Sequence, residues 1–354
     1  FVPSALMLGV TRHIATDVAS VPLLWIVPLL LYLVTFIVAF GKTSTRRTEW
    51  SSVLVRFGVI PLALSFMVSY GGLAVQMALH LAWFFFAALL GHSRLSEDRP
   101  HTERLTEFYL WISVGGVAGG IFSALIAPLL FDTVLEYPIS IVLALLLTQH
   151  GRALVTVPFR ATGALVAVLL GLAWVAQVGR LPVLVALLAL IAILNASITF
   201  RKVVPYASTV AVAFLIVSVI SSPDVLAQQR SFFGVYSVHE TEDNQVALAS
   251  GTTIHGSQFA AGTSREFTPT SYYHSEGPLG QIMNSGIPRR SVGIVGLGVG
   301  GIAAYGRTGD RYTFFEIDPT VVELANNTSL FTYLNGTLAE VSTVVGDGRL
   351  SLAD

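Results

Sequence analysis

The sequence predicts a polytopic α-helical membrane domain followed by an α/β domain, with a small antiparallel β-subdomain between them. The chain has 354 residues, of which 53% are hydrophobic and only 12% charged. Its mean hydropathy of +0.71 is too high for an ordinary soluble domain. The charge balance also changes along the chain, since residues 1–222 carry 13 Lys and Arg against 8 Asp and Glu, whereas residues 223–354 carry 7 against 13.

The first domain, residues 1–222, is predicted from its apolar stretches. A bilayer crossing takes about 20 helical residues. Stretches of that kind lie near 21–40, 52–70, 72–91, 108–131, 182–199 and 206–222, with shorter candidates near 134–149 and 162–178. We therefore expect about 7–8 membrane helices. The run GGVAGG at 115–120 places small residues four apart, which predicts a close helix contact that we expect within the chain.

The loop charges predict an orientation. Basic residues on one side of the membrane are Lys42, Arg46, Arg47, Arg56, Arg94, Arg99, Arg104, Arg152, Arg160, Arg201 and Lys202. The other side has only Arg12 and Arg180. The first side is cytoplasmic by the positive-inside rule. Counting crossings onward then places the domain after Ser222 on the external face.

Several polar residues fall in or beside the predicted spans. Gln76 and His80 share a helix face, and Arg12, His13 and Asp17 cluster just before a span. Such residues suggest a functional site by default. Interhelical hydrogen bonds or an interfacial salt bridge explain them better than a transport path, because a transporter usually carries more buried charge.

The composition excludes several kinds of site. The chain has no cysteine, so it has no disulfide, thiolate nucleophile or Cys-ligated metal. No His, Asp and Glu grouping has metal-ligand spacing, and we expect no metal. The second half is acidic, which argues against a nucleic-acid partner. The chain opens without Met or a basic n-region and ends just after a third predicted strand, so we expect a segment of a longer protein.

The β-subdomain, residues 229–285, is predicted from short β-type runs. These are SFFGVYSV, QVALAS and TTIHGSQF, with the polar turn HETEDN between the first two. Short β-type runs joined by a polar turn are typical of a small antiparallel sheet. A helix is expected around 275–284 before the linker GIPRR.

Residues 291–354 have the pattern of a Rossmann-like nucleoside-binding domain. VGIV predicts a buried parallel strand, and Gly296, Gly298 and Gly301 have G-x-G-x-x-G spacing ahead of a helix starting near Gly301. The strand YTFFEID carries Glu316, where a carboxylate can accept ribose hydroxyls. The strand VSTVV ends beside Asp347, again at a carboxyl edge. A purely structural unit remains the alternative, because glycines can serve helix–sheet packing alone.

These residues resemble a known family. Residues 229–354 resemble spermidine synthase and its aminopropyltransferase relatives, which join a small β-domain to a methyltransferase-type Rossmann domain. The segments TDVASVPLLWIVPLLLYLVTFIVAF and LTEFYLWISVGGVAGGIFSALIAPLLF are similar to bacterial proteins that fuse a multi-span region to such a domain. The resemblance covers essentially the whole chain and implies a multi-pass protein of the bacterial inner (plasma) membrane.

The resemblance also implies a set of ligand contacts. GLGVGG corresponds to the glycine loop around decarboxylated S-adenosylmethionine, Glu316 to the acid that holds the ribose, and Asp347 to the acid that meets the adenine amino group. Gln258 corresponds to the glutamine of the ligand-facing strand, and Tyr273 with His274 to a pair near the active site. The implied binding residues are Gly296, Gly298, Gly300, Gly301, Glu316, Asp347 and Gln258.

The departures from the family concern catalysis. Val299 stands where the loop normally has an acid, Ala249-Ser250-Gly251 replaces Leu-Asp-Gly, and the uncharged TPTS replaces the acidic pair that grips the amine. The family's catalytic aspartate would lie beyond Asp354, so the catalytic residue is unknown. Tyr273, His274 and His255 are candidates. A neutral His255 imidazole could act as a base, although a hydrogen-bonded structural histidine is commoner.

Two functions follow. One is an aminopropyl transfer in which an amine attacks the methylene next to the sulfonium of decarboxylated S-adenosylmethionine. The other is a catalytically silent scaffold or accessory subunit of a membrane complex that keeps the fold.

No tightly bound cofactor is expected, and NAD is the rival ligand for the same fold. Expected partners are the lipid bilayer and either other membrane subunits or a second copy of the chain. An active enzyme would need its cytoplasmic substrate, which conflicts with the external orientation.

Overall fold

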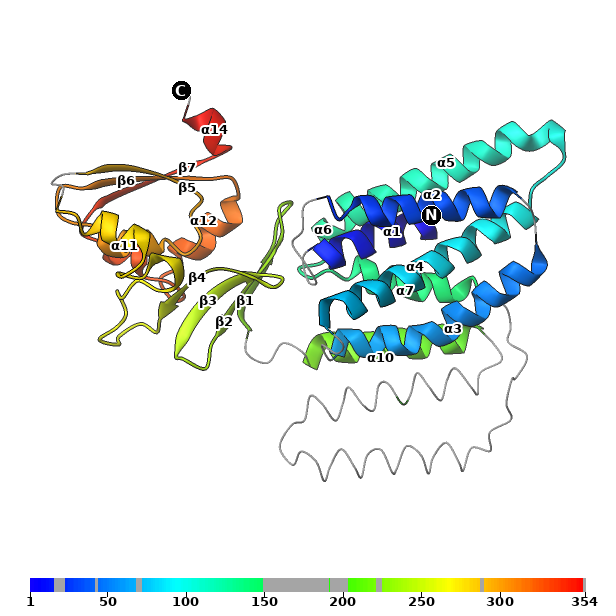
Figure 1. Ribbon diagram of the computed structural model, residues 1–354, viewed down its shortest axis with the longest axis horizontal. Helices are drawn as coiled ribbons and strands as arrows, with labels where there is room; N and C mark the ends of the chain where they lie inside the picture. Colours follow the sequence, from blue (N-terminus) through cyan, green and yellow to red (C-terminus); the bar gives the residue numbers. More distant parts are fainter. Residues whose placement is uncertain are drawn as a thin grey trace. The chain divides into compact units, whose positions relative to one another are not determined.

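The computed structural model of the chain describes residues 1–15, 23–41, 44–67, 72–148, 191, 203–220, 225–286 and 290–352. They belong to two compact units, residues 1–223 and 224–354 (Figure 1). Each unit has its own hydrophobic core. The described part of the first unit is helical, and that of the second contains two sheets.

The first unit is a bundle of apolar helices (Figure 1). Its elements are α1 (Val2–His13), α2 (Ile26–Gly41), α3 (Thr45–Met67), α4 (Gly72–Glu97), η2 (Thr102–Arg104), α5 (Leu105–Ile121), η3 (Phe122–Ile126), α6 (Ala127–Leu130), α7 (Glu136–Leu146) and α10 (Val203–Ile220). The run from η2 to α6 is continuous. Its π-helical turn η3 lies just before Pro128, which has no N–H to continue the α-helical ladder.

Among the described residues, three helical runs are long and apolar enough to cross a membrane: Thr45–Phe66, Gly72–Glu97 and Thr102–Leu130. Ile26–Gly41 and Glu136–Leu146 are apolar but shorter. Large apolar side chains such as Ile37, Trp111 and Leu129 are exposed on these helices, which is compatible with a lipid environment. Apart from residue 191, the spans predicted near 162–178 and 182–199 lie outside the described residues.

Helix α4 packs against α1, α2 and α3 and carries the buried polar residue His80. Its Nδ1 lies 2.9 Å from the Tyr137 hydroxyl of α7, and its Nε2 lies 3.0 Å from Oγ of Ser65 of α3. Both ring nitrogens thus bond to neighbouring helices, as the sequence predicts for polar groups in spans. Asp17, expected near Arg12 and His13, lies outside the described residues.

The glycine-rich face of α5 lies against the start of α1. A Cβ atom at Gly119 would lie 2.5 Å from the carbonyl oxygen of Phe1, and one at Gly115 would lie 3.1 Å from the nitrogen of Phe1. At Gly120, by contrast, a Cβ would meet nothing within 4 Å. The close helix contact predicted from GGVAGG is therefore within the chain.

The second unit begins with a four-stranded antiparallel sheet. Its strands are β1 (Val225–Arg230), β2 (Val235–Glu240), β3 (Gln245–Ser250) and β4 (Thr253–Phe259), in the order β1-β2-β3-β4. The register between β3 and β4 shifts after Leu248, which pairs with Gly256. The predicted antiparallel sheet is thus present, with an additional strand, β1, ahead of SFFGVYSV.

Three parallel strands follow, in the order β5-β6-β7. The remaining elements are η4 (Ser271–Tyr273), α11 (Pro278–Met283), β5 (Ser291–Val295), η5 (Gly301–Tyr305), β6 (Arg311–Glu316), α12 (Pro319–Asn326), α13 (Tyr333–Gly336), β7 (Glu340–Val345) and α14 (Gly348–Ser351). Tyr312 and Phe314 of β6 are buried in a core that includes Val321 and Leu324 of α12. The parallel order places the carboxyl ends of all three strands at one edge of the sheet.

Candidate functional site

The glycine loop follows β5 directly. Gly296, Gly298 and Gly300 have φ angles of 89°, 56° and 75°. These values lie in the left-handed region, which glycine adopts without a steric penalty. The N–H of Gly296 donates to the carbonyl of Phe315 of β6. The turn therefore requires glycine for its backbone geometry, whether or not a ligand binds.

The helix predicted to begin near Gly301 is shorter and tighter than expected. It is the five-residue 3₁₀ segment η5, and Gly306 follows it in an extended conformation. So short a segment aligns few peptide dipoles, and it does not supply the N-terminus of a full α-helix to a ligand. Binding at this loop would have to rely on backbone amides of the turn and on side chains around it.

Much of the glycine loop is covered by the rest of the unit. A Cβ atom at Gly298 would collide with the carbonyl oxygen of His255 of β4, and one at Gly300 would lie 2.5 Å from Cδ2 of Leu334. At Gly301 it would lie 3.1 Å from the ring of Tyr273. Gly296 differs, because a Cβ there would meet nothing within 4 Å. Open space beside the loop is thus found at its first glycine.

Glu316 ends the central strand β6 next to this loop. Its side chain is buried, and its carboxylate accepts hydrogen bonds from the N–H of Leu297 at 2.7 Å and of Asp318 at 2.9 Å. A carboxylate offers about four lone-pair positions, so these two bonds leave acceptor capacity. The sequence-predicted ribose acid is therefore held by the glycine loop.

Asp318 is a site residue that the sequence reasoning missed. It is fully buried, accepts the N–H of Thr320 at 2.9 Å as the N-cap of α12, and accepts the hydroxyl of Ser231. Burial, a hydrogen bond from its hydroxyl to Asp318 and the charges of Asp318 and Glu316 together raise the pKa of Tyr236. The N-cap signal Asp-Pro-Thr was visible in the sequence, but the partner from the β-subdomain was not.

Asp347 follows the neighbouring strand β7 and is exposed. Its carboxylate accepts the N–H of Arg349 at 2.9 Å and of Leu350 at 3.3 Å, so it caps α14. Glu316 pairs with Val345 in the parallel register, two residues before Asp347. The two predicted acids therefore share one edge of the sheet, and only Asp347 faces solvent freely.

Gln258 lies within a polar network of the unit. Its amide nitrogen donates to the Thr332 hydroxyl at 2.6 Å and to the carbonyl of Glu266 at 3.1 Å, and its oxygen accepts the Thr332 N–H at 2.8 Å. The Glu266 carboxylate accepts the Thr332 hydroxyl as well. Gln258 is buried, so in this arrangement it ties β4 to the segment before α13.

The three candidate catalytic side chains differ in burial and in hydrogen bonding. His255 is half-buried on β4, and burial lowers its pKa while the Glu316 charge partly offsets this. Tyr273 is half-buried, packs on Gly301, and accepts the Tyr305 hydroxyl at its carbonyl at 2.5 Å. His274 is exposed, and its Nδ1 accepts the N–H of Glu276 at 3.3 Å. Of the three, His255 shares its surroundings with Glu316.

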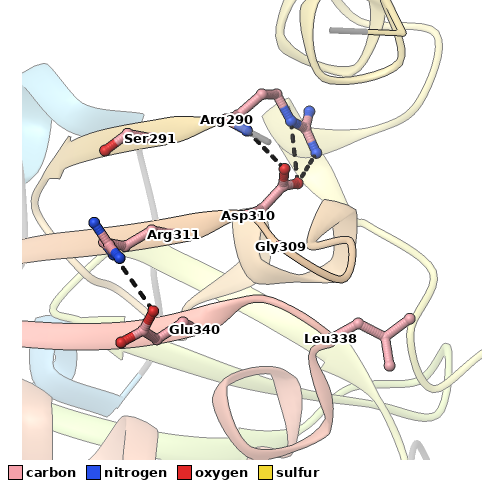
Figure 2. Close-up of a pocket in the computed structure, with 7 residues that line it drawn as sticks. All are labelled: Arg290, Ser291, Gly309, Asp310, Arg311, Leu338 and Glu340. Atoms are coloured by element: carbon pink, nitrogen blue, oxygen red, sulfur yellow. Dashed lines mark hydrogen bonds and ion pairs between the residues drawn. The ribbon is translucent and has the colours of Figure 1, made fainter. Parts of the chain in front are cut away.

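A pocket of about 320 Å³ opens at the opposite edge of the parallel sheet (Figure 2). It is lined by Arg290, Ser291, Gly309, Asp310, Arg311, Leu338 and Glu340. Three of these are the first residues of β5, β6 and β7. Arg311 and Glu340 form an exposed ion pair at 3.4 Å. The sequence reasoning did not select this edge.

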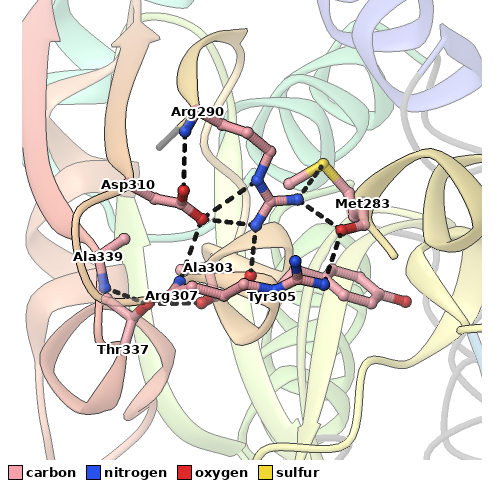
Figure 3. A network of polar contacts seen from close by, with 8 residues as sticks. All are labelled: Met283, Arg290, Ala303, Tyr305, Arg307, Asp310, Thr337 and Ala339. Carbon is pink, nitrogen blue, oxygen red and sulfur yellow. Dashed lines mark hydrogen bonds and ion pairs between the residues drawn. The ribbon is translucent and has the colours of Figure 1, made fainter. Parts of the chain in front are cut away.

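The wall of this pocket is a buried ion pair (Figure 3). Nη2 of Arg290 lies 2.5 Å from Oδ2 of Asp310, and its other guanidinium nitrogens donate to Asp310 and to the carbonyl of Met283. Nη2 also donates to the carbonyl of Tyr305 at 2.9 Å. Because the guanidinium donors are occupied, the pair joins α11, β5, η5 and β6 and has few groups left for a ligand.

No protein-family model matches the chain. Neither curated proteins nor solved structures gave a match. The resemblance to aminopropyltransferases therefore stays a prediction from the motifs quoted above. Among the described residues, no group of three or more His, Cys, Asp and Glu side chains is placed to hold a metal ion.

Proposed function

We propose that residues 224–354 are a Rossmann-like, spermidine synthase-like unit that binds a nucleoside of the S-adenosylmethionine type, and that the helices before it hold it at a membrane. The observation that carries the proposal is the bond between the Glu316 carboxylate and the Leu297 N–H. It fixes an acid with spare acceptor capacity beside the open first glycine, Gly296. This is where a ribose would need its hydroxyl acceptors.

The ligand would lie along the carboxyl edge of the sheet. Glu316 would accept the ribose hydroxyls, and the exposed Asp347 would accept the amino group of the base. In the transfer reaction that the resemblance suggests, the amine nitrogen forms a bond to the methylene carbon, the carbon–sulfur bond breaks, and methylthioadenosine leaves. The amine then loses a proton to a base. The unit would contribute mainly orientation of the two reactants.

A catalytically silent scaffold is the second candidate, and Val299 favours it. This residue replaces the family's loop acid and is buried, so it contributes packing in place of a charge. Gln258, the other expected ligand contact, has its amide groups bonded within the unit. A protein of this kind would keep the fold and bind the nucleoside weakly or not at all.

Calorimetric titration of the full chain in detergent tests binding. Decarboxylated S-adenosylmethionine, methylthioadenosine and NAD would each be added to wild type, Glu316→Ala, Glu316→Gln and Asp347→Ala. We expect the two adenosine compounds to bind and the Glu316 variants to bind at least tenfold more weakly, because charge-assisted hydrogen bonds are lost. Glu242→Ala, at an exposed turn of the same unit, is the matched control. Tighter binding of NAD than of the two adenosine compounds would contradict the proposal.

An activity assay separates the two candidates. Wild-type protein would be incubated with putrescine and decarboxylated S-adenosylmethionine, and released methylthioadenosine would be measured. Steady release that is abolished in Glu316→Ala, with thermal unfolding unchanged, supports the transferase. Nucleoside binding without release supports the scaffold. Release that persists in Glu316→Ala contradicts the assigned ribose acid.

A further inference from the structure

The turn between β1 and β2 carries two adjacent aromatic side chains that face solvent. Phe232 is 80% exposed and Phe233 is 50% exposed. Their ring centroids are 5.6 Å apart in an edge-to-face arrangement. Neither ring belongs to the hydrophobic core of the unit. An exposed aromatic pair on a short turn offers a contact surface at little cost in side-chain entropy.

The turn is fixed in position by the residue just before the pair. The N–H groups of Phe233 and Gly234 donate to Oγ of Ser231, at 3.0 Å and 3.3 Å. The Ser231 N–H donates to the carbonyl of Gly234 at 2.9 Å, which closes the turn. The Ser231 hydroxyl in turn donates to the carboxylate of Asp318. The turn is therefore attached to the carboxyl edge of the parallel sheet.

Asp318 is hydrogen-bonded to Glu316, the candidate ribose acid. Its backbone N–H donates to Glu316 at 2.9 Å, and the Tyr236 hydroxyl bonds to its side chain. One chain of contacts thus runs from Phe232 through Ser231 and Asp318 to Glu316. The turn that carries the aromatic pair and the candidate ribose acid therefore belong to one hydrogen-bonded network at the carboxyl edge of the sheet.

We propose that Phe232 and Phe233 form an aromatic wall of the nucleoside site, against which the base of the ligand stacks. The inference rests on the proposed nucleoside binding and adds the recognition of the base. Nucleobases stack on aromatic side chains independently of sequence, because every base has a π face. Asp347 would contact the edge of the base and the phenyl rings its face. The two contacts together select a planar heterocycle over a ribose derivative without a base.

Variants of the pair test the stacking. Methylthioadenosine affinity would be measured by calorimetry for wild type, Phe232→Ala, Phe233→Ala, Phe232→Tyr and Phe232→Leu. We expect Phe232→Ala, Phe233→Ala or both to weaken binding by about tenfold or more. If Phe232→Ala weakens binding, Phe232→Tyr should keep the affinity and Phe232→Leu should not, because only a ring supplies a stacking face. Ile282→Ala, an exposed apolar residue of α11, is the control and should change nothing.

The results distinguish this inference from the function on which it rests. Binding that is lost in Glu316→Ala but unchanged in both Ala variants and in Phe232→Ala/Phe233→Ala overturns the aromatic wall and leaves the nucleoside site. Absence of binding by wild type overturns both. The difference in fluorescence between Phe232→Trp and wild type, which has five Trp of its own, gives a second readout. Quenching of this added fluorescence by methylthioadenosine supports the inference. Quenching of it by brominated lipid in vesicles, with none by the nucleoside, would assign the turn to the bilayer and overturn the inference.

Discussion

A Cβ atom at Gly256 of β4 would lie 2.6 Å from Cγ2 of Val299 in the glycine loop. Gly256 has a φ of 150°, which L side chains rarely adopt, and Val299 is fully packed. Strand β4 and the glycine loop therefore pack closely because Gly256 has no side chain where the Val299 side chain lies. This contact joins the antiparallel sheet to the parallel one within the second unit.

Gly256→Ala is expected to lower the free energy of unfolding of the second unit by about 1–3 kcal/mol, because an added methyl has no room and the backbone is unfavourable. Denaturant unfolding of the full chain in detergent, followed by a probe in this unit, measures the change. Gly293→Ala is the matched control, since a Cβ there would make an ordinary 3.7 Å contact with Phe315. Equal effects of the two substitutions would contradict the tight fit.

Val299→Asp would introduce the acid that aminopropyltransferases, which the sequence resembles, have in this loop. Here we expect it to destabilise the unit by several kcal/mol, because the new carboxylate would be buried without a partner. Burial would raise the folded-state pKa of that carboxyl above its unfolded value. The part of the penalty that comes from ionisation should therefore shrink as the pH falls from the raised folded-state pKa toward the unfolded value of about 3.9, while the cost of burying a neutral carboxyl stays.

Val299→Ala is the control for that experiment. It removes apolar contacts without adding a titrating group, so its loss of stability should not depend on pH. Thermal unfolding at several pH values separates the two variants. A stable Val299→Asp protein with tighter nucleoside binding would instead show that the loop accommodates the family's acid, and would argue for the transferase over the scaffold.

Much of the second unit follows from local sequence patterns. Short apolar runs with β-branched residues predict strands β5, β6 and β7, and the parallel arrangement expected for them places Glu316 and Asp347 at one edge. The antiparallel strands β2, β3 and β4 follow from short β-type runs and a polar turn between them. These features depend on residues close together in the chain.

Other features depend on pairs that no local pattern contains. Ser231 binds Asp318 across 87 positions, and Gln258 binds Thr332 across 74. The family resemblance assigns Gln258 to a ligand, and no local pattern indicates the Thr332 partner. The short η5 has a local cause instead. The glycine spacing typical of a following helix is present, but Gly306 and the turn to Asp310 end the segment after five residues.

The buried pair of Arg290 and Asp310 should make the free energy of unfolding depend on pH in the acid range. The hydrogen bonds and charge of Arg290 hold the pKa of Asp310 below its usual value. A carboxyl whose folded-state pKa is depressed stabilises the fold above its unfolded pKa, and that contribution is lost as the pH falls through the folded value. Asp310→Asn should lower the free energy of unfolding near pH 7 by about 3–5 kcal/mol, because it leaves a buried guanidinium without its charge partner.

Urea unfolding between about pH 7 and pH 2 checks this prediction. The difference between wild type and Asp310→Asn should shrink toward the acid end, where the wild-type carboxyl is protonated. Glu340→Gln, in the exposed pair with Arg311, should change stability by less than about 1 kcal/mol at any pH. A difference for Asp310→Asn that does not vary with pH would show that the pair stabilises by shape alone.

The contact between α1 and α5 offers a matched pair of glycines. Gly119→Ala would bring its methyl to 2.5 Å from the Phe1 carbonyl oxygen, whereas Gly120→Ala would meet nothing within 4 Å. We expect the first to lower the thermal stability of the detergent-solubilised protein, by about 1–3 kcal/mol in unfolding free energy. The second should be neutral or slightly stabilising, because alanine favours helix. A destabilising Gly120→Ala would show that this face packs against something further.

The orientation in the membrane follows from where the basic residues gather. Arg47 donates to the carbonyls of Val38 and Ala39 at the end of α2, and Arg94 donates to the carbonyl of Leu147 after α7. These helix ends, with the loop that contains Arg99 and Arg104, are predicted to be cytoplasmic.

Labelling of introduced cysteines tests this orientation. These 354 residues contain no cysteine, so single introduced cysteines can report the side directly. Asp98→Cys and Glu242→Cys both replace exposed residues, and a membrane-impermeant maleimide would be added to intact cells. We expect Glu242→Cys to react at once and Asp98→Cys only after permeabilisation, because the charge bias predicts that the second unit is outside. Labelling of Glu242→Cys only after permeabilisation would place that unit in the cytoplasm, where decarboxylated S-adenosylmethionine is made, and would strengthen the transferase.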